Sequence, residues 1–169
     1  MSQASDHVKW CISKSKKEIE ECKKYGKRIK HRGLLEIKPD VNKAKEHIEK
    51  AEHNLDAIGK FKEIGFSDWS ISAGFYCIYH CFLAICVKSG YESRNQACTI
   101  ALIEMLKEEN KISIDEKFIN ILKDEDIKGI HENKIIEMRE DYTYGIDISV
   151  KDEAKIKELI ENCKEIIDT

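Results

Sequence analysis

The chain has 169 residues, of which 36% are charged and 41% are hydrophobic. Its eight glycines and single proline exclude a collagen-like, proline-rich or glycine–serine linker protein and argue against an all-β fold with many turns. Residues 1–33 contain ten lysines and arginines and four acidic residues, a net charge of +6, whereas the whole chain carries −3. Such a basic segment either binds a phosphate backbone or an acidic partner, or is a solvated helix face.

Two long helices are predicted in the first third of the chain. The first spans residues 5–25, where apolar residues recur at helical spacing, and Gly26 and Gly33 bracket the basic connector that follows it. The second begins after Pro39 and ends at Gly65. Its apolar seam has residues at alternating steps of three and four, namely Val41, Ala44, Ile48, Ala51, Leu55 and Ile58.

A third helix is predicted around an uncharged run of 17 residues, from Ile71 to Val87. Ser67 would act as its N-cap, and Gly90 would close it. The run is at the short limit for a membrane span, and it contains serine, glycine, tyrosine and histidine, which lipid-facing helices tolerate poorly. We therefore expect a helix buried by its neighbours and no membrane association.

Four shorter helices are predicted in the rest of the chain. The first covers residues 93–109, and the second follows a capping box that begins at Ser113. After a charged turn over residues 124–130, a helix begins near Glu132 and ends near Tyr144. The last helix follows the sequence Ser149-x-x-Asp152. Since no strand pattern competes with these helices, the predicted fold class is all-α.

The seven cysteines are an odd number and lack the spacing of a disulfide framework. We expect them to be free thiols that pack in the core of a cytoplasmic protein without a signal peptide. Cys77, His80 and Cys81 share one helical turn, but a fourth ligand at matching spacing is missing, so we predict no metal. No sequence motif for a cofactor is present either, and we predict none. His80 is either a hydrogen-bonded core histidine or part of a polar cleft.

Arginine is rare in this chain, which has 25 lysines and four arginines. A planar guanidinium binds phosphate or carboxylate through two parallel hydrogen bonds, which an ammonium group does not do. Arg94 and Arg139 are therefore candidates for a binding site. The alternative is a structural role, in which Arg139 pairs with Glu140 or Asp141 and Arg94 helps to cap a helix.

Three segments in the middle of the chain, followed by a fourth near its end, resemble the HEPN domain. They are residues 65–69 (GFSDW), 73–80 (AGFYCIYH), 90–94 (GYESR) and 139–142 (REDY). The resemblance covers residues 41–168 and leaves the basic first helix unexplained. It implies a HEPN-like bundle of four to five helices over residues 39–169, preceded by an extra basic N-terminal helix and connector over residues 1–38.

The resemblance also implies a set of activities. Many HEPN proteins are dimers that cleave RNA without a metal through an R-x(4–6)-H motif, whereas others serve only as binding modules. Several are paired with a small nucleotidyltransferase in toxin–antitoxin systems. Neither arginine is followed by the motif histidine in this chain, because the corresponding positions are Gln96 and Tyr144. Catalytic residues are therefore not assigned, since glutamine cannot transfer the proton and tyrosine does so poorly at neutral pH.

We thus predict a homodimeric binding module for RNA or a nucleotide, as part of a toxin–antitoxin or RNA-processing system. One alternative is a metal-independent ribonuclease with altered residues, in which His80 or His131 replaces the motif histidine. A second alternative is a non-catalytic, structural or antitoxin-like partner-binding protein, whose arginines pair only with its own carboxylates. A separate idea, by analogy with family members that have a nucleotidyltransferase partner, is that this enzyme nucleotidylates Tyr142 or Tyr144. The expected binding residues are His80, Arg94, Asn95, Gln96, Arg139, Asp141, Tyr142 and Tyr144.

Overall fold

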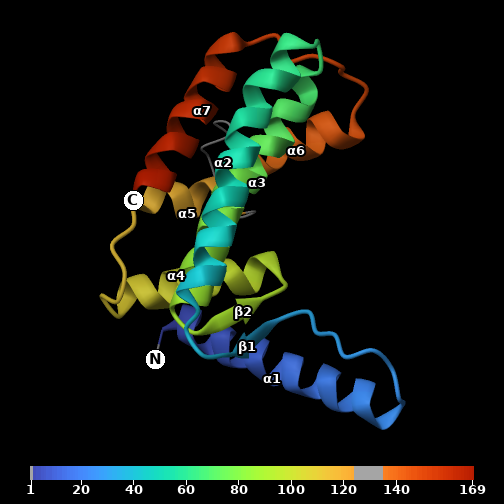
Figure 1. Cartoon of the computed structure of the whole chain (residues 1–169), viewed down its shortest axis with the longest axis vertical. Coiled ribbons are helices and arrows are strands. Elements are labelled where there is room, and N and C mark those ends of the chain that lie inside the picture. The colour runs from blue at the N-terminus through green and yellow to red at the C-terminus, as the bar shows by residue number, and fades with distance from the viewer. Residues whose placement is uncertain (1, 124–134) are drawn as a thin grey trace. The chain divides into compact units, whose positions relative to one another are not determined.

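The computed structural model describes residues 2–123 and 135–169, and these form seven helices and a two-stranded antiparallel sheet (Figure 1). The predicted all-α class is confirmed. In chain order the elements are α1 Gln3–Lys24, β1 Leu34–Glu36, α2 Val41–Glu63, α3 Ser67–Lys88, β2 Tyr91–Ser93, α4 Gln96–Glu108, α5 Glu116–Leu122, α6 Ile135–Tyr144 and α7 Glu153–Asp168. The turn predicted at 124–130, the helix start near Glu132 and the candidate base His131 lie outside the described residues.

The chain forms two compact units, each of which is discontinuous in sequence. The first unit contains residues 1–45 and 82–113, and the second unit contains residues 46–81 and 114–169. Helices α2 and α3 each contribute residues to both units. The domain boundary expected near residue 38 stays a prediction.

In the first unit, α1 packs on α4 and on the small sheet. Leu34 of β1 is paired with Ser93 of β2, and Glu36 is paired with Tyr91. Gly33 permits the close approach of the chain to α1, because a Cβ atom at this position would lie 2.5 Å from the carbonyl oxygen of Cys11. The sequence did not indicate this sheet, since three-residue strands are too short for an alternating pattern.

In the second unit, α3 packs closely against α7. A Cβ atom at Gly74 of α3 would lie 2.4–2.6 Å from three side-chain carbons of Leu159, so these helices approach each other where α3 lacks a side chain. The Cys163 thiol of α7 donates to the Gly74 carbonyl at 3.6 Å. The hydroxyl of Ser67 accepts a hydrogen bond from the Val150 N–H at 2.8 Å, so Ser67 ties the segment before α7 to the start of α3.

Helix α3 is long and apolar enough to cross a membrane by length and composition alone. However, 67% of its most apolar window is buried inside the protein, as expected for a core helix.

Three predicted helix starts are wrong. Residue Ser93 belongs to β2, and α4 begins at Gln96 with Asn95 as its N-cap. The N-caps of α5 and α7 are Asp115 and Asp152, whose carboxylates accept from the backbone two residues ahead. Aspartate is as strong an N-cap as serine. The predictions that took Ser113 and Ser149 as the N-caps therefore placed the starts of α5 and α7 too early.

The expectation that all cysteines are free is wrong for one pair. A disulfide joins Cys11 of α1 to Cys98 of α4. The expectation is correct for the other five cysteines, which are free and buried.

Candidate functional site

The predicted site residues are divided between the two units. Arg94, Asn95 and Gln96 lie in the first unit. The other five, in the second unit, are His80, Arg139, Asp141, Tyr142 and Tyr144. The expectation that both groups line one cleft stays a prediction, and each group is described by itself.

Arg139 of α6 has no ion-pair partner among the described residues. Its guanidinium carbon lies 4.5 Å from the ring centroid of Phe75, on α3, in a cation–π contact. Its Nε is buried and has no hydrogen-bond partner in the described chain. A buried donor of this kind costs free energy unless a ligand or partner satisfies it. The pairing of Arg139 with Glu140 or Asp141, considered from the sequence, is not observed.

Phe75 is also the centre of an aromatic row on α3. Its ring stacks on Tyr79 at a centroid distance of 5.9 Å and meets the edge of Tyr76 at 5.2 Å. Phe75 itself is buried, whereas Tyr76 is 44% exposed. The row therefore exposes an aromatic side chain, Tyr76, next to the Phe75 ring on which the Arg139 guanidinium lies.

His80 is paired with His47 of α2. Their Nδ1 atoms lie 3.1 Å apart, so one ring donates its proton to the other. Both side chains are half-buried. Burial, followed by the charges of His47 and Lys50, lowers the pKa of His80 below its usual 6.5. The pair is thus held with at least one neutral imidazole near pH 7, the form that can accept a proton.

The two tyrosines at the end of α6 differ in exposure. Tyr144 is 81% exposed, so its hydroxyl is open to solvent. Tyr142 is half-buried; burial raises its pKa, and the nearby carboxylates Asp147, Asp141 and Asp152 add to this effect. Tyr142 is therefore a neutral hydrogen-bonding group and not a base at neutral pH.

Arg94 belongs to a charge cluster centred on Glu92 in the first unit. Its Nε donates to Oε1 of Glu92 at 2.9 Å, and the same oxygen accepts from Nε2 of His31 at 3.1 Å. Lys43 lies 3.9 Å from the other carboxylate oxygen. Burial alone would raise the pKa of Glu92, but the hydrogen bond from His31 and the charge of Arg94 lead the effects that lower it. Arg94 of the predicted site is thus already paired with a carboxylate of its own chain.

Asn95 and Gln96 have structural positions at the start of α4. The side chain of Asn95 accepts from the N–H of Cys98 at 3.0 Å, and its carbonyl accepts from the hydroxyl of Thr99 at 2.9 Å. Gln96 is the first residue of the helix. The amide oxygen of Asn95 therefore caps α4. A role of Asn95 toward a ligand stays a prediction.

A serine, a histidine and a carboxylate form a chain of hydrogen bonds in the first unit. The hydroxyl of Ser15 lies 3.2 Å from Nδ1 of His31, whose Nε2 contacts Glu92. This order is that of a hydrolase triad. Ser15, however, is 0% exposed, so no substrate can reach it, and the chain of bonds serves to fasten the basic connector to α1 and β2.

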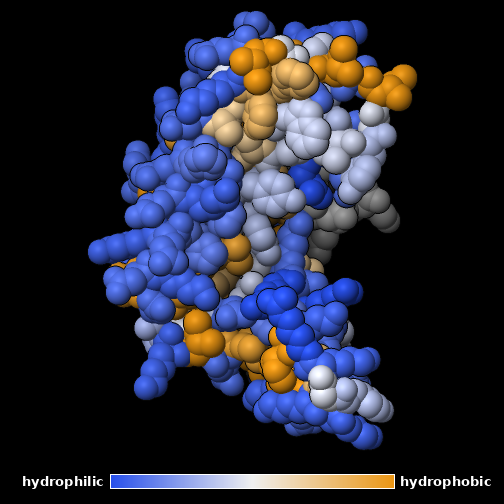
Figure 2. All heavy atoms as spheres, turned by 45° about the vertical axis from the view of Figure 1, so that its right-hand side comes forward, coloured by the Kyte–Doolittle hydropathy of each residue, from blue (hydrophilic) through white to orange (hydrophobic). Residues whose placement is uncertain are grey.

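Exposed aromatic residues stand among the lysines of α1 and the connector. Trp10 is 55% exposed with Lys14 over its ring, and Tyr25 is 63% exposed between Lys24 and Lys27. An open cavity of about 300 Å³ beside Tyr25 is lined by Lys27, Lys30, His31 and Arg32, together with Glu18, Glu21 and Cys22. We call Trp10, Lys14, Lys24, Tyr25 and Lys27 the basic aromatic face. Figure 2 shows that the surface in view is hydrophilic over most of its area, with apolar side chains in only a few places.

The thiols of Cys77 and Cys81, which precede and follow His80 on α3, are held in their protonated form. A hydrogen bond with Cys163 is the largest effect on Cys77 and raises its pKa, and the hydrogen bond with Cys77, together with burial, raises the pKa of Cys81. Both residues therefore stay protonated at neutral pH, which disfavours nucleophilic attack and metal binding by this pair.

With this geometry in place, comparison with known families identifies the class of protein. The sequence profile of the HEPN domain matches residues 44–169, which is more than half of the chain. The chain therefore belongs to the HEPN family, as its sequence segments had indicated. No curated protein matches the sequence significantly. The matched region begins after α1, β1 and the basic connector, which lie outside it.

Four residues of these sites were not predicted from the sequence, namely His31, His47, Phe75 and Glu92. Each acts on a residue far away in the chain: His47 is 33 positions from His80, and His31 is 61 positions from Glu92. No spacing rule connects residues at such distances. The only local signals were a histidine on the predicted second helix and another in the basic connector.

Proposed function

We propose that this HEPN-family chain is a binding module that recognises RNA or a nucleotide through phosphate groups and exposed aromatic rings. The observation that carries the proposal is Arg139, whose guanidinium is stacked on Phe75 and whose buried Nε lacks a partner in the described chain. A phosphate oxygen is the acceptor that best fits a stacked, planar guanidinium.

The basic aromatic face gives independent support for RNA over a free nucleotide. Single-stranded RNA is bound by proteins that combine lysines along the backbone with aromatic rings on which bases stack. Trp10 and Tyr25 are both more than half exposed and are flanked by lysines. A free nucleotide has too few phosphates to contact such an extended face.

The direct test is binding of a fluorescein-labelled single-stranded RNA, measured by fluorescence anisotropy. Arg139→Lys keeps the charge but removes the planar fork, and we expect it to weaken binding about tenfold or more. Glu140→Gln, an exposed neighbour on the same helix, is the matched control and should not weaken it. Unchanged affinity in Arg139→Lys, with an unchanged melting temperature, would contradict a phosphate-binding role for Arg139.

The second candidate function is metal-independent RNA cleavage, which the His47–His80 pair favours. Such cleavage needs one group that accepts the 2′-hydroxyl proton and another that protonates the leaving oxygen. Two imidazoles whose Nδ1 atoms are 3.1 Å apart supply one neutral and one proton-donating ring. This arrangement would replace the histidine that the arginine motifs of this chain lack.

Incubation of the chain with RNA in the presence of a metal chelator separates the two candidates. The binding-module proposal expects intact RNA. Cleavage that is lost in His80→Gln, His47→Gln or Arg139→Ala and kept in the control His53→Gln would replace it with the ribonuclease. His53 is an exposed histidine of the same helix as His47.

Partner proteins form the third element of the proposal. We expect a cytoplasmic homodimer, which light scattering after gel filtration would reveal as a mass of twice 19.6 kDa. If a small nucleotidyltransferase modifies this chain, Tyr144 is the acceptor we expect, because its side chain is 81% exposed. Mass spectrometry after incubation with such an enzyme and ATP would locate the added nucleotide, and Tyr144→Phe should abolish it.

A further inference from the structure

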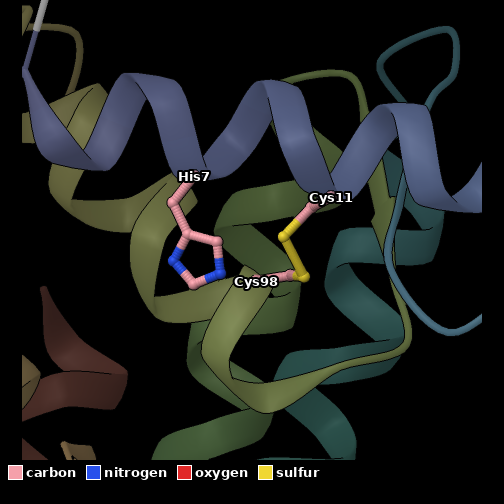
Figure 3. Close-up of side chains that lie close together, drawn as sticks. All are labelled: His7, Cys11 and Cys98. Atoms are coloured by element: carbon pink, nitrogen blue, oxygen red, sulfur yellow. A yellow bond between two sulfur atoms is a disulfide. The ribbon is translucent and has the colours of Figure 1, made fainter.

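Three residues of the first unit bring together side chains of the kinds that bind metal ions. His7 and Cys11 lie one turn apart on α1, and Cys98 lies in the first turn of α4 (Figure 3). A ring nitrogen of His7 and the sulfur atoms of Cys11 and Cys98 all lie within 4.8 Å of one another. Figure 3 shows the imidazole beside the disulfide that joins the two cysteines. Among the described residues, this is the one such cluster of three histidine, cysteine or carboxylate ligands.

The chemistry of these three ligands suits zinc. Zn²⁺ is bound by cysteine sulfur and histidine nitrogen, and sites with two cysteines and one histidine keep a fourth position for water or another ligand. Tetrahedral coordination by such ligands separates the ligand atoms by about 3.5–3.8 Å. The sulfurs must therefore move apart from their bonded distance, and the imidazole nitrogen, which now lies within 4.8 Å of both, must take up this spacing from each.

The position of Cys98 favours the thiolate that a metal needs. The side chain of Asn95 accepts from the Cys98 N–H, so Cys98 stands at the positive end of the α4 dipole. Cys11 is buried on the face of α1 that packs against α4, and His7 stands on the same helix one turn earlier. Reduced thiols at this position would thus be held together by the packing of two helices, without the disulfide.

We propose that the His7–Cys11–Cys98 cluster is a redox-controlled zinc site: the disulfide excludes the metal, and reduction opens the site to one Zn²⁺. In the reduction, two low-molecular-weight thiols give two electrons and two protons to the protein disulfide and become a disulfide themselves. Zn²⁺ then binds to the two sulfur atoms and displaces both thiol protons. Either the disulfide or the metal therefore joins α1 to α4, but not both.

Cobalt(II) titration of the full-length chain tests the proposal, because cobalt substitutes for zinc and reports its ligands by absorption. After reduction with a phosphine and removal of bound metal, we expect thiolate-to-cobalt absorption that saturates at about one equivalent and is displaced by Zn²⁺. The oxidised chain, with the disulfide verified by mass, should show no such absorption.

Substitutions assign the ligands. Cys11→Ser and Cys98→Ser should each lose most of the thiolate absorption, and His7→Gln should weaken zinc binding by about tenfold or more in competition with a chromogenic chelator. The controls are Cys22→Ser, another buried cysteine of α1, and His53→Gln, an exposed histidine; both should bind like the wild type. Circular dichroism checks that each variant folds.

Three results would overturn the proposal. The first is a reduced wild-type chain that gains no thiolate absorption, and the second is an oxidised wild-type chain that gains the same absorption as the reduced chain. The third is wild-type zinc affinity in folded His7→Gln, which would remove histidine from the ligand set. We predicted no metal from the sequence, because the cluster considered there was Cys77, His80 and Cys81. Cys98 lies 87 residues from Cys11, and no local motif joins them.

Discussion

At the scale of the residue, His80 should make the stability of the chain depend on pH. Its pKa is lower in the folded chain than the usual 6.5, mainly because of burial. Between these two values the unfolded chain binds more protons, so the free energy of unfolding rises with pH and falls on acidification through this window. We expect a lower urea midpoint at about pH 5.5 than at about pH 7.5, with a smaller difference in His80→Gln.

The control for this prediction is His53→Gln, because His53 is exposed on α2 and should leave the pH dependence unchanged. His47→Gln provides a second check, since it removes one of the charges that lower the pKa of His80. A histidine titration followed by NMR should then show a higher pKa for His80. A pKa of His80 that stays the same would mean that burial and Lys50 produce the shift without His47.

Glu92 and Arg94 differ in how much they should contribute to stability, although they share one ion pair. Glu92 also accepts from His31, which is 5% exposed, so Glu92→Gln leaves a buried imidazole without its charged partner. We expect a loss of about 1–3 kcal/mol in urea unfolding. Arg94→Ala removes a half-exposed cation and should cost less than about 1 kcal/mol.

The two substitutions also have different pH signatures. The pKa of Glu92 is lowered in the folded chain, so its contribution is present above its usual 4.5 and is lost as the pH falls through the folded value. Glu92→Gln should therefore flatten the acid limb of the stability curve. Equal losses for the two variants at neutral pH would show that Arg94, and not His31, is the important partner.

At the scale of the element, two helix glycines should respond to alanine in opposite ways, because only Gly74 lies where α3 packs closely on α7. A methyl group at Gly74 would lie 2.4–2.6 Å from Leu159, and Gly74→Ala should destabilise the chain by about 1–3 kcal/mol. No described residue places a heavy atom within 4 Å of such a group at Gly59 of α2. Gly59→Ala should stabilise by about 0.4–1 kcal/mol, because alanine loses less backbone freedom than glycine on folding.

Urea unfolding of the two alanine variants measures both effects in the same assay. Gly74→Ala together with Leu159→Ala should recover part of the loss, since the smaller side chain makes room for the methyl group. If Gly74→Ala is neutral alone, α3 and α7 do not approach as closely in solution as the structure places them.

At the scale of the whole molecule, the uneven charge distribution predicts how RNA binding depends on salt. The first 33 residues carry +6 although the chain carries −3. Each phosphate contact of a single strand contributes roughly −0.7 to the slope of log affinity against log salt. Replacing Lys24 and Lys27 by glutamine should therefore make the slope shallower by up to about 1.4.

The matched control replaces Lys157 and Lys164 of α7 by glutamine, which changes the net charge by the same amount. Both lysines are exposed, but they lie in the acidic remainder of the chain. Their replacement should leave the slope almost unchanged. An equal effect of both pairs would mean that RNA responds to the total charge and not to the basic aromatic face.

Much of the fold was predictable, because a helix is determined by residues three and four positions apart. The periodicity of residues 41–58 and the uncharged run from Ile71 to Val87 placed α2 and α3. The helix starts were less certain, since Asp115 and Asp152 compete with Ser113 and Ser149 as N-caps. The two rare arginines also marked positions with distinct environments, Arg94 in a charge cluster and Arg139 on an aromatic ring.

The sequence by itself thus determined the all-α class, the order of the helices and the HEPN membership, all of which depend on local patterns. Only the tertiary structure decided the β1–β2 pairing, the Cys11–Cys98 disulfide, the His47–His80 pair and the lack of a hydrogen-bond partner for Arg139 Nε among the described residues. Each of these joins or isolates groups that are far apart in the chain. Contacts of this kind depend on which helix faces pack together, and packing is set by the shape of the whole core and not by the spacing of neighbouring residues.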